Sequence, residues 1–197
     1  MKARRWGQAI LGLAGITVLW LTLWAILGPR APDGVVPGAE AANPQVPANG
    51  SKMGPSGLPV PRFVSLKNES TNVRRGPSSD HGVLYVYRQK GMPVEIVAES
   101  EHWRRIRDSA GEEGWVYKSL LSGARTVLVA PGKPGLTVNL KKNPDIAAVD
   151  IARLESGVVA DVEGCDGVWC EIAAGDYDGY APQNMLFGVY PGERFGD

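Results

Sequence analysis

Short runs of alternating hydrophobic and polar residues, separated by turn residues, fill the chain from residue 62 onward. The clearest runs are residues 83–87, 94–98 and 103–107, followed after a further turn by Gly114-Trp115-Val116. Alternation with a period of two residues is typical of half-buried β-strands. Parallel pairing would need a crossover of a dozen or more residues, and the turns here are far shorter. The pattern therefore predicts an all-β fold of antiparallel strands that form a small β-barrel.

The same alternation separates buried from exposed side chains within the strands. Val94 and Ile96 share one face, and Ile106 is expected to face them from a neighbouring strand. Trp103 lies three residues before Ile106 and so falls on the opposite face, where a half-exposed ring can act as a platform. Trp115, between a glycine and a valine, is expected to be tightly packed in a buried strand.

A second copy of this pattern follows the first. Three segments match in order: residues 139–144 with 72–77, 169–172 with 103–106, and 179–186 with 114–121. The offset falls from 67 to 66 to 65 residues, as expected if one residue is lost in each of two turns. Self-similarity of this kind indicates a duplicated unit. We therefore predict two tandem barrels, over residues 62–124 and 125–197.

The N-terminal part of the chain has the features of a membrane-targeting segment. Lys2, Arg4 and Arg5 precede an uncharged run over residues 7–28. As a helix this run would be about 33 Å long, enough to cross a bilayer core of roughly 30 Å. Basic residues before the run predict a cytoplasmic N-terminus and an extracytoplasmic remainder. Residues 1–28 are therefore expected to form a single transmembrane helix, either an uncleaved signal anchor or a cleaved signal peptide.

Residues 29–61 have the composition of a linker. They hold eight prolines and five glycines, and no aromatic residue. Such a segment has too few apolar side chains to build a core. We expect it to be a disordered tether between the membrane segment and the first barrel.

Charge narrows the choice of partners. The chain has 21 basic and 21 acidic residues, so its net charge is zero and no strong field favours nucleic acid as a partner. The charge is unevenly shared, because residues 62–124 carry ten basic and eight acidic residues whereas residues 125–197 carry six and eleven. Two interpretations are open: both surfaces are simply solvated, or opposite charge helps the repeats to dock.

One stretch of the first repeat resembles a known family. It resembles bacterial SH3 domains in the order of its motifs. These are Asn72-Val73-Arg74-Arg75-Gly76-Pro77, a following strand, a glycine, Trp103 about a dozen residues later, and the closing Gly114-Trp115-Val116. The resemblance covers residues 62–124 well and 125–190 less well, and the tandem is similar to SH3-like proteins of the bacterial envelope. It implies a five-stranded, partly open barrel that binds cell-wall peptidoglycan or envelope partners and does not catalyse a reaction.

The second repeat also resembles eukaryotic SH3 domains at its closing segment, residues 179–186. In those domains a proline and a tyrosine of this segment join a tryptophan to hold polyproline. Tyr180 and Pro182 lie in the segment and Trp169 matches the tryptophan, but Met185 stands where the second tyrosine would be. The Ala-Leu-Tyr-Asp-Tyr signature is absent from both repeats. Recognition of proline-rich peptides is therefore not expected.

The pattern and the resemblance together predict a ligand-binding surface rich in aromatic residues. The candidate binding residues are Trp103, Arg105, Tyr87, Tyr117, Arg74, Trp169, Tyr180 and Pro182. Trp103, Tyr87 and Tyr117 are expected to surround a shallow groove, while arginines, including Arg107, pair with carboxylates. In the alternative interpretation the aromatic rings only cover the open ends of small barrels.

The two cysteines, Cys165 and Cys170, flank Asp166-Gly167, a strong two-residue turn signal. With that turn, Cys165 would lie opposite Val168 and Cys170 opposite Glu163, so a disulfide would need a bulge or a longer loop. An extracytoplasmic compartment and an even number of cysteines favour the disulfide over two free thiols. Two cysteines and distant histidines do not suffice for a metal site.

The sequence offers no candidate catalytic centre. No motif brings together a nucleophile, an acid and a base, and no cofactor-binding loop occurs. We therefore expect a non-catalytic protein without a cofactor, anchored in the cell membrane, that binds peptidoglycan or its stem peptides outside the cytoplasm. If the signal is cleaved, the protein is instead secreted to the periplasm. Two alternative functions are an adaptor that docks another envelope protein and an accessory regulator of a wall hydrolase.

Overall fold

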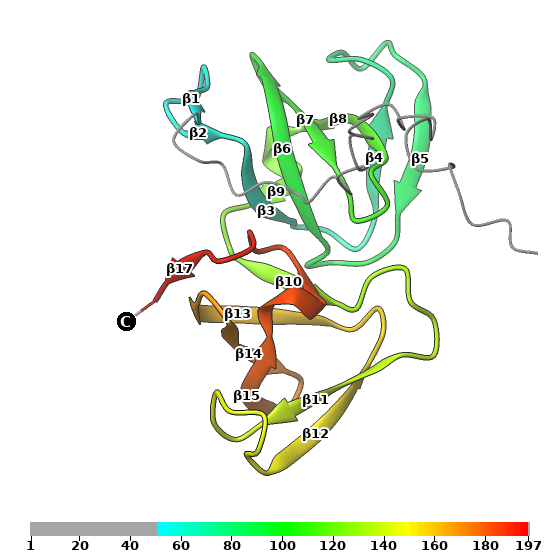
Figure 1. Ribbon diagram of the computed structural model, residues 1–197. Coiled ribbons are helices and arrows are strands. Elements are labelled where there is room, and N and C mark those ends of the chain that lie inside the picture. The colour runs from blue at the N-terminus through cyan, green and yellow to red at the C-terminus, as the bar shows by residue number, and fades with distance from the viewer. Residues whose placement is uncertain (1–50, 197) are drawn as a thin grey trace, which may run out of the picture. The chain divides into compact units, whose positions relative to one another are not determined.

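The computed structural model describes residues 51–196, and its regular elements are β-strands apart from two single-turn 3-10 helices (Figure 1). The predicted all-β class is therefore confirmed for this part of the chain. Within residues 51–196, no helix is long and apolar enough to span a membrane. The predicted transmembrane helix, residues 1–28, and most of the predicted linker lie outside the described residues.

The first repeat forms a seven-stranded antiparallel sheet with the spatial order β5-β4-β8-β7-β6-β3-β9. Its elements are β3 (Arg62–Leu66), β4 (Thr71–Arg74), β5 (Val83–Tyr87), β6 (Pro93–Ser100), β7 (Trp103–Arg107), β8 (Glu113–Tyr117), the 3-10 helix η1 (Lys118–Leu120) and β9 (Leu121–Ser122). The end strands β5 and β9 do not pair with each other, so the sheet is not closed into the barrel that the alternation predicted. The family resemblance implied a partly open barrel of five strands, and the sheet is open but has seven strands.

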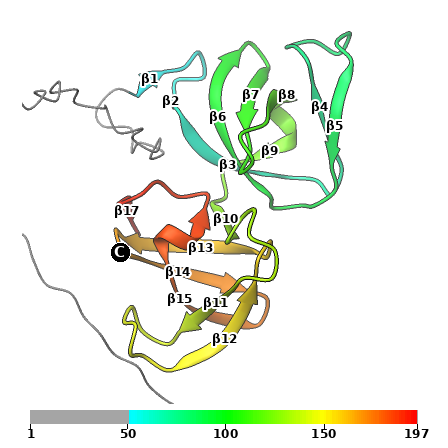
Figure 2. The ribbon, with the colours of Figure 1, turned by 45° about the vertical axis from the view of Figure 1, so that its right-hand side comes forward.

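The second repeat has the same spatial order, element by element: β12-β11-β15-β14-β13-β10-β16. Its elements are β10 (Thr126–Val129), β11 (Thr137–Lys141), β12 (Asp150–Glu155), β13 (Val159–Asp166), β14 (Trp169–Ala174), β15 (Tyr177–Pro182), η2 (Gln183–Met185) and β16 (Leu186–Phe187). One further strand, β17 (Arg194–Phe195), pairs with β13 outside this order (Figure 2). The shared order confirms the internal repeat.

The core of the first sheet follows the predicted alternation. Val94, Ile96 and Ile106 are buried, and Ile96 lies directly opposite Ile106. Trp103 is half-buried on the other face, as predicted. The expectation for Trp115 was wrong: along β8 the buried residues alternate with half-exposed ones, so that Trp115 lies on the outer face and its neighbours fill the inner one.

The glycine before Trp115 explains why the inner face of β8 can approach the core so closely. A Cβ atom at Gly114 would collide with the side chain of Val73. At the equivalent position in the second repeat, a Cβ atom on Gly179 would lie 2.6 Å from Ile151 Cδ1 and 2.6 Å from the Lys141 carbonyl oxygen. Both repeats therefore use glycine here because the neighbouring strand leaves no room for a side chain.

The last part of the predicted linker is ordered. Residues 51–61 include a small hairpin, in which β1 (Lys52–Met53) pairs with β2 (Pro59–Val60). The Glu99 carboxylate holds the hairpin by accepting hydrogen bonds from the Ser56 backbone N–H, 2.9 Å, and from the Ser56 hydroxyl, 2.8 Å. Proline content had suggested disorder, but proline also starts edge strands and hairpins of this kind.

Glu99 is the centre of a buried ionic cluster. Its side chain is fully buried and lies 2.7 Å from Arg62 Nη2 and 3.0 Å from Arg104 Nε. Burial alone would raise the pKa of Glu99, but the Ser56 backbone hydrogen bond, the bonds from Arg62 and the Ser56 hydroxyl, and the charge of Arg104 outweigh it, so that the pKa is lowered. The cluster joins the hairpin, β3 and the β6–β7 pair.

In the second repeat, Cys165 and Cys170 form a disulfide. The predicted turn is wrong by one residue: Gly167 and Val168 are its central residues, which places Cys165 directly opposite Cys170. Gly167 has φ +96°, the left-handed conformation that primed hairpin turns require. The Asp166 carboxylate accepts hydrogen bonds from the backbone N–H groups of Val168 and Trp169, and these bonds lower its pKa. Asp166 therefore starts the turn and does not form its centre.

Aromatic packing and hydrogen bonds join the two repeats. The Phe63 ring lies 5.2 Å from the Phe187 ring and 4.7 Å from the Tyr190 ring, measured between centroids. The Tyr190 hydroxyl donates to Glu95, 3.0 Å, and burial together with the Glu95 charge raises the pKa of Tyr190. Among residues 51–196 no ion pair links the repeats. The contacts thus give no support to docking by opposite charge.

We expect Glu99→Gln to destabilise the protein by about 3 kcal/mol, because two poorly exposed arginines lose their buried anion. A lowered pKa means that the contribution of Glu99 is fully present above pH 4.5, its ordinary pKa, and is lost as pH falls through the folded-state value. The difference between wild type and variant should therefore shrink below that pH. Urea unfolding between pH 7 and pH 3 measures it. The exposed Glu69→Gln is the control, and a pH-independent difference would contradict the assignment.

Removing the disulfide, by Cys165→Ala with Cys170→Ala, should cost about 2 kcal/mol, since the bond closes a short loop. Thermal unfolding with and without reductant is the measurement. Reductant should lower the unfolding temperature of the wild type toward that of the variant and leave the variant unchanged. Equal unfolding temperatures for the oxidised wild type and the variant would show that the bond contributes nothing.

Candidate ligand-binding grooves

A surface groove of about 630 Å³ lies over three adjacent strands of the first repeat, β4, β8 and β7. We call it groove 1. Its lining residues are Asn72, Arg74, Pro77, Ser78, Ser79, Glu101, Trp103, Tyr117 and Leu120. Outward-facing side chains of the strands form its floor, and the loop after β4 and the turn between β6 and β7 form its rim.

An aromatic pair forms the apolar part of groove 1. Trp103 lies opposite Tyr117 in the β7–β8 register, and their rings meet edge to face with centroids 5.4 Å apart. Tyr117 is 37% exposed, so the pair is accessible to a ligand. The sequence predicted both residues in one groove, and the structure brings them together.

A cation lies in the same groove. One guanidinium nitrogen of Arg74 donates to the His81 carbonyl oxygen, 2.7 Å. This bond fixes the side chain and leaves the other N–H groups of the guanidinium for a ligand. Arg74 was a predicted site residue, and it lies in the lining of groove 1 with Trp103 and Tyr117.

The second repeat carries a smaller groove at the equivalent place, about 280 Å³, which we call groove 2. Its lining residues are Thr137, Val138, Asn139, Lys141, Ile146, Trp169, Pro182 and Met185. Six of these positions correspond by the repeat offsets to lining positions of groove 1: Asn139, Lys141, Ile146, Trp169, Pro182 and Met185 match Asn72, Arg74, Ser79, Trp103, Tyr117 and Leu120. The duplication therefore reproduced a groove as well as a fold.

The two grooves differ in charge. Lys141 lies opposite Asp150 in the β11–β12 register and forms an ion pair with it, 2.6 Å. The matching residue Arg74 lies opposite Val83, and it makes no ion pair within the described part of the chain. In groove 2, Lys141 is thus neutralised by Asp150 on the neighbouring strand. In groove 1, no residue of the neighbouring strand neutralises Arg74.

Three predicted residues lie outside both grooves. The Tyr87 hydroxyl donates to Asp108, 2.8 Å, and burial, reinforced by this bond, raises the pKa of Tyr87. Arg105 forms an ion pair with Glu113, 2.6 Å. Tyr180 lies on the other side of Trp169, where burial and the neighbouring Glu171 raise the pKa of Tyr180. Arg107 is likewise held by carboxylates, those of Glu95 and Glu113.

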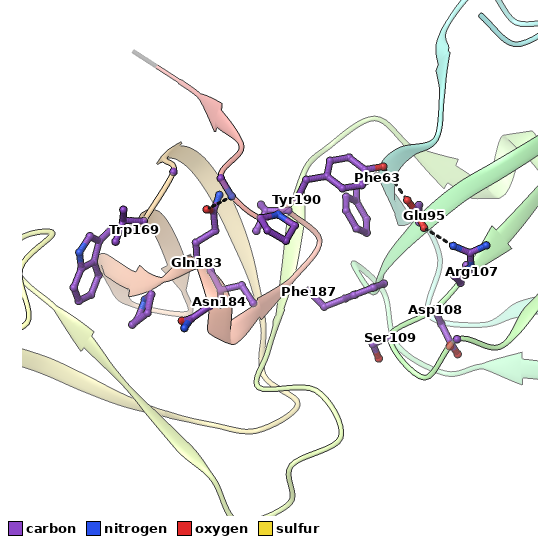
Figure 3. Close-up of a pocket in the computed structure, with 18 of the residues that line it drawn as sticks. Phe63, Glu95, Arg107, Asp108, Ser109, Trp169, Gln183, Asn184, Phe187 and Tyr190 are labelled. Carbon is purple, nitrogen blue, oxygen red and sulfur yellow. Dashed lines mark hydrogen bonds and ion pairs between the residues drawn. The ribbon is translucent and has the colours of Figure 1, made fainter. Parts of the chain in front are cut away.

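The cavity between the repeats is larger than either groove, about 930 Å³, and Figure 3 shows Phe63 beside Tyr190 there. It shares Ile146, Trp169 and Pro182 with groove 2, so that the two spaces meet at the Trp169 ring. Sequence reasoning missed Ile146, together with Asn72, Leu120 and Glu101. The repeat offsets were the available signal, because they pair most of these positions between the two copies.

The sequence matches the model of one protein family, described as a bacterial SH3 domain, at residues 67–123 and 135–188. These segments make up more than half of the chain and fall in the two sheets described above, so the chain belongs to the bacterial SH3 domain family and carries two copies of the domain. No curated protein matches the sequence.

Solved structures similar to the chain include two proteins of Trichomonas vaginalis. The first, NlpC2, is 16% identical with a TM-score of 0.29, and the match covers 64% of this chain and 48% of that chain. The second, NlpC1, is 18% identical with a TM-score of 0.27, and the match covers 64% and 45%. The matched part thus spans about half the length of these structures.

Proposed function

We propose that the protein is a non-catalytic binding protein whose two grooves recognise peptidoglycan through its stem peptides. The observation that carries the proposal is the recurrence of one groove, built from an aromatic floor and a basic residue, at equivalent positions of both repeats. Membership in the bacterial SH3 family supports it, because such domains commonly bind the cell wall or envelope partners.

The chemistry of groove 1 suits a short peptide with a free carboxylate. The Trp103 and Tyr117 rings present apolar surface at low entropic cost, since each side chain has few rotatable bonds. Arg74 supplies N–H donors, and the planar guanidinium is well suited to a carboxylate. The groove is shallow and open, which suits a polymer that must be bound along its length.

Two grooves in one chain favour a polymeric ligand. Once one groove is occupied, the other meets neighbouring units of the same polymer at a high effective concentration. Affinity for the intact wall would then exceed affinity for a single fragment without any additional contact. A repetitive ligand such as peptidoglycan fulfils this condition.

We further propose that the domains lie outside the cytoplasm, tethered to the cell membrane by residues 1–28 and the proline-rich segment after them. The disulfide supports this location, because such bonds persist in oxidising compartments. The basic residues before the apolar run support the orientation. In this arrangement the protein would hold the membrane close to the wall.

An envelope adaptor is the second candidate function. The supporting observation is the edge strand β5, which pairs with no other strand of residues 51–196 on one of its sides and carries Val83 and Leu84, each about two-fifths exposed. An edge of this kind can accept an additional strand from a partner. In that case binding would depend on β5 and would be unaffected by changes in the grooves.

We expect full-length protein in mild detergent to be retained by purified peptidoglycan sacculi. Trp103→Ala and Trp169→Ala should each weaken retention about tenfold, since each removes the main apolar contact of a groove. Co-sedimentation over a range of sacculus concentrations is the measurement.

Tyr177→Ala is the matched control, because Tyr177 is 54% exposed and lies in neither groove. The control should be retained like the wild type. Absence of retention by the wild type, or equal retention of all variants, would contradict the proposed function.

A further inference from the structure

The turn between β6 and β7 contains a residue in an unfavourable conformation. Glu101 has φ +48°, in the left-handed region that residues with side chains seldom adopt. The equivalent residue of the second repeat is Gly167, for which a positive φ carries no steric penalty. The same backbone geometry is thus built with glycine in one copy and with glutamate in the other.

Within the described structure, no contact of the Glu101 side chain offsets the strain of its backbone. Its carbonyl oxygen accepts a hydrogen bond from Arg104, 3.1 Å, but a glycine carbonyl could accept the same bond. Within residues 51–196 its carboxylate forms no hydrogen bond and no ion pair, and the residue is exposed. The turn requires the positive φ at this position, but it does not require a glutamate side chain, and a strained residue whose side chain makes no contact within the fold points to a binding role.

The location of Glu101 indicates its role. It lies in the lining of groove 1, as does Arg74, and these two residues do not form an ion pair with each other. Trp103 follows Glu101 after one residue, and Tyr117 lies beside Trp103 on β8, the strand that also pairs with β4 at Arg74. Groove 1 therefore offers an anion on its rim, an aromatic pair and a cation on its floor, each still available.

We propose that groove 1 is a zwitterion site, which recognises a ligand end that bears both an ammonium group and a carboxylate. Glu101 accepts hydrogen bonds from the ammonium group, Arg74 donates to the carboxylate, and the aromatic pair contacts the carbon chain between them. This inference rests on the proposed function and specifies the part of the stem peptide that is bound: the free end of a diamino acid.

Groove 2 has no counterpart of Glu101, and its basic residue is already paired. Gly167 replaces the glutamate, and Asp150 neutralises Lys141. Ile146 and Met185 add apolar surface to its lining. The two grooves are therefore not redundant: groove 1 selects the charged end, and groove 2 accepts an uncharged segment.

The test uses full-length protein in detergent and three synthetic tripeptides that end in a diamino acid. One has a free side-chain amine and free carboxylates, one is acetylated at that amine, and one is amidated at the terminal carboxylates. Titration calorimetry should show binding of the free peptide, with about tenfold loss on acetylation or on amidation. Glu101→Gln should abolish the discrimination against the acetylated peptide, and Arg74→Gln the discrimination against the amidated one.

The matched controls are Glu69→Gln and Arg88→Gln, exposed residues of the same repeat outside the groove. Both should bind the three peptides like the wild type. Equal affinity of the wild type for all three peptides would overturn the zwitterion site and leave the proposed function standing. Failure of the wild type to bind any peptide, combined with no retention on sacculi, would overturn both.

A stability measurement separates this role from a structural one. Glu101→Gly relieves the left-handed strain, so the unfolding temperature should stay equal or rise while affinity for the free peptide falls about tenfold. A residue that served the fold would show the reverse. A clear drop in unfolding temperature would therefore overturn the assignment.

Discussion

In each repeat, one bond joins the two strands of the hairpin that carries the groove tryptophan, close to its turn. In the first repeat the bond is the buried ion pair between Glu99 and Arg104, and in the second it is the disulfide between Cys165 and Cys170. In both copies the two bonded residues lie directly opposite each other in the strand register, close to the turn. Because the groove tryptophan starts the strand after that turn, a loose hairpin tip would displace it. The chemistry of the bond differs between copies, but the constraint is the same.

One residue of each bond also contacts an additional segment of its repeat. Glu99 binds the β1–β2 hairpin through Ser56, and Cys165 lies opposite Phe195 of β17. The additional segment precedes the sheet in the first repeat, as the β1–β2 hairpin, and follows it in the second repeat, as β17. A small open sheet buries little apolar surface, so it gains from such local reinforcement.

Features that depend on local alternation could be predicted from the sequence. Features that depend on the pairing register between strands, or on packing, were predicted wrongly. Strand positions and the repeat followed from the period of two residues and the drifting offset. Asp166-Gly167 was misplaced because a dipeptide turn rule was applied alone. The internal repeat indicates the correct turn, because matching Trp169 with Trp103 puts Gly167 at the position of Glu101, the first residue of the turn in the first repeat. Trp115 was misplaced for a similar reason: the inward residue of β8 is set by the space at Gly114, which only packing reveals.

The grooves show why charge at a site could not be predicted from residue type. Arg74 and Lys141 are both basic and both follow a register irregularity, between Val73 and Arg74 in one copy and between Leu140 and Lys141 in the other. Such bulges redirect side chains, and here each accompanies a basic residue that lines a groove. Whether the charge remains available depends on the partner across the strand, Val83 or Asp150. Both copies therefore share the bulge and the groove, while the residue across the strand decides whether the basic side chain of each groove is paired within the protein.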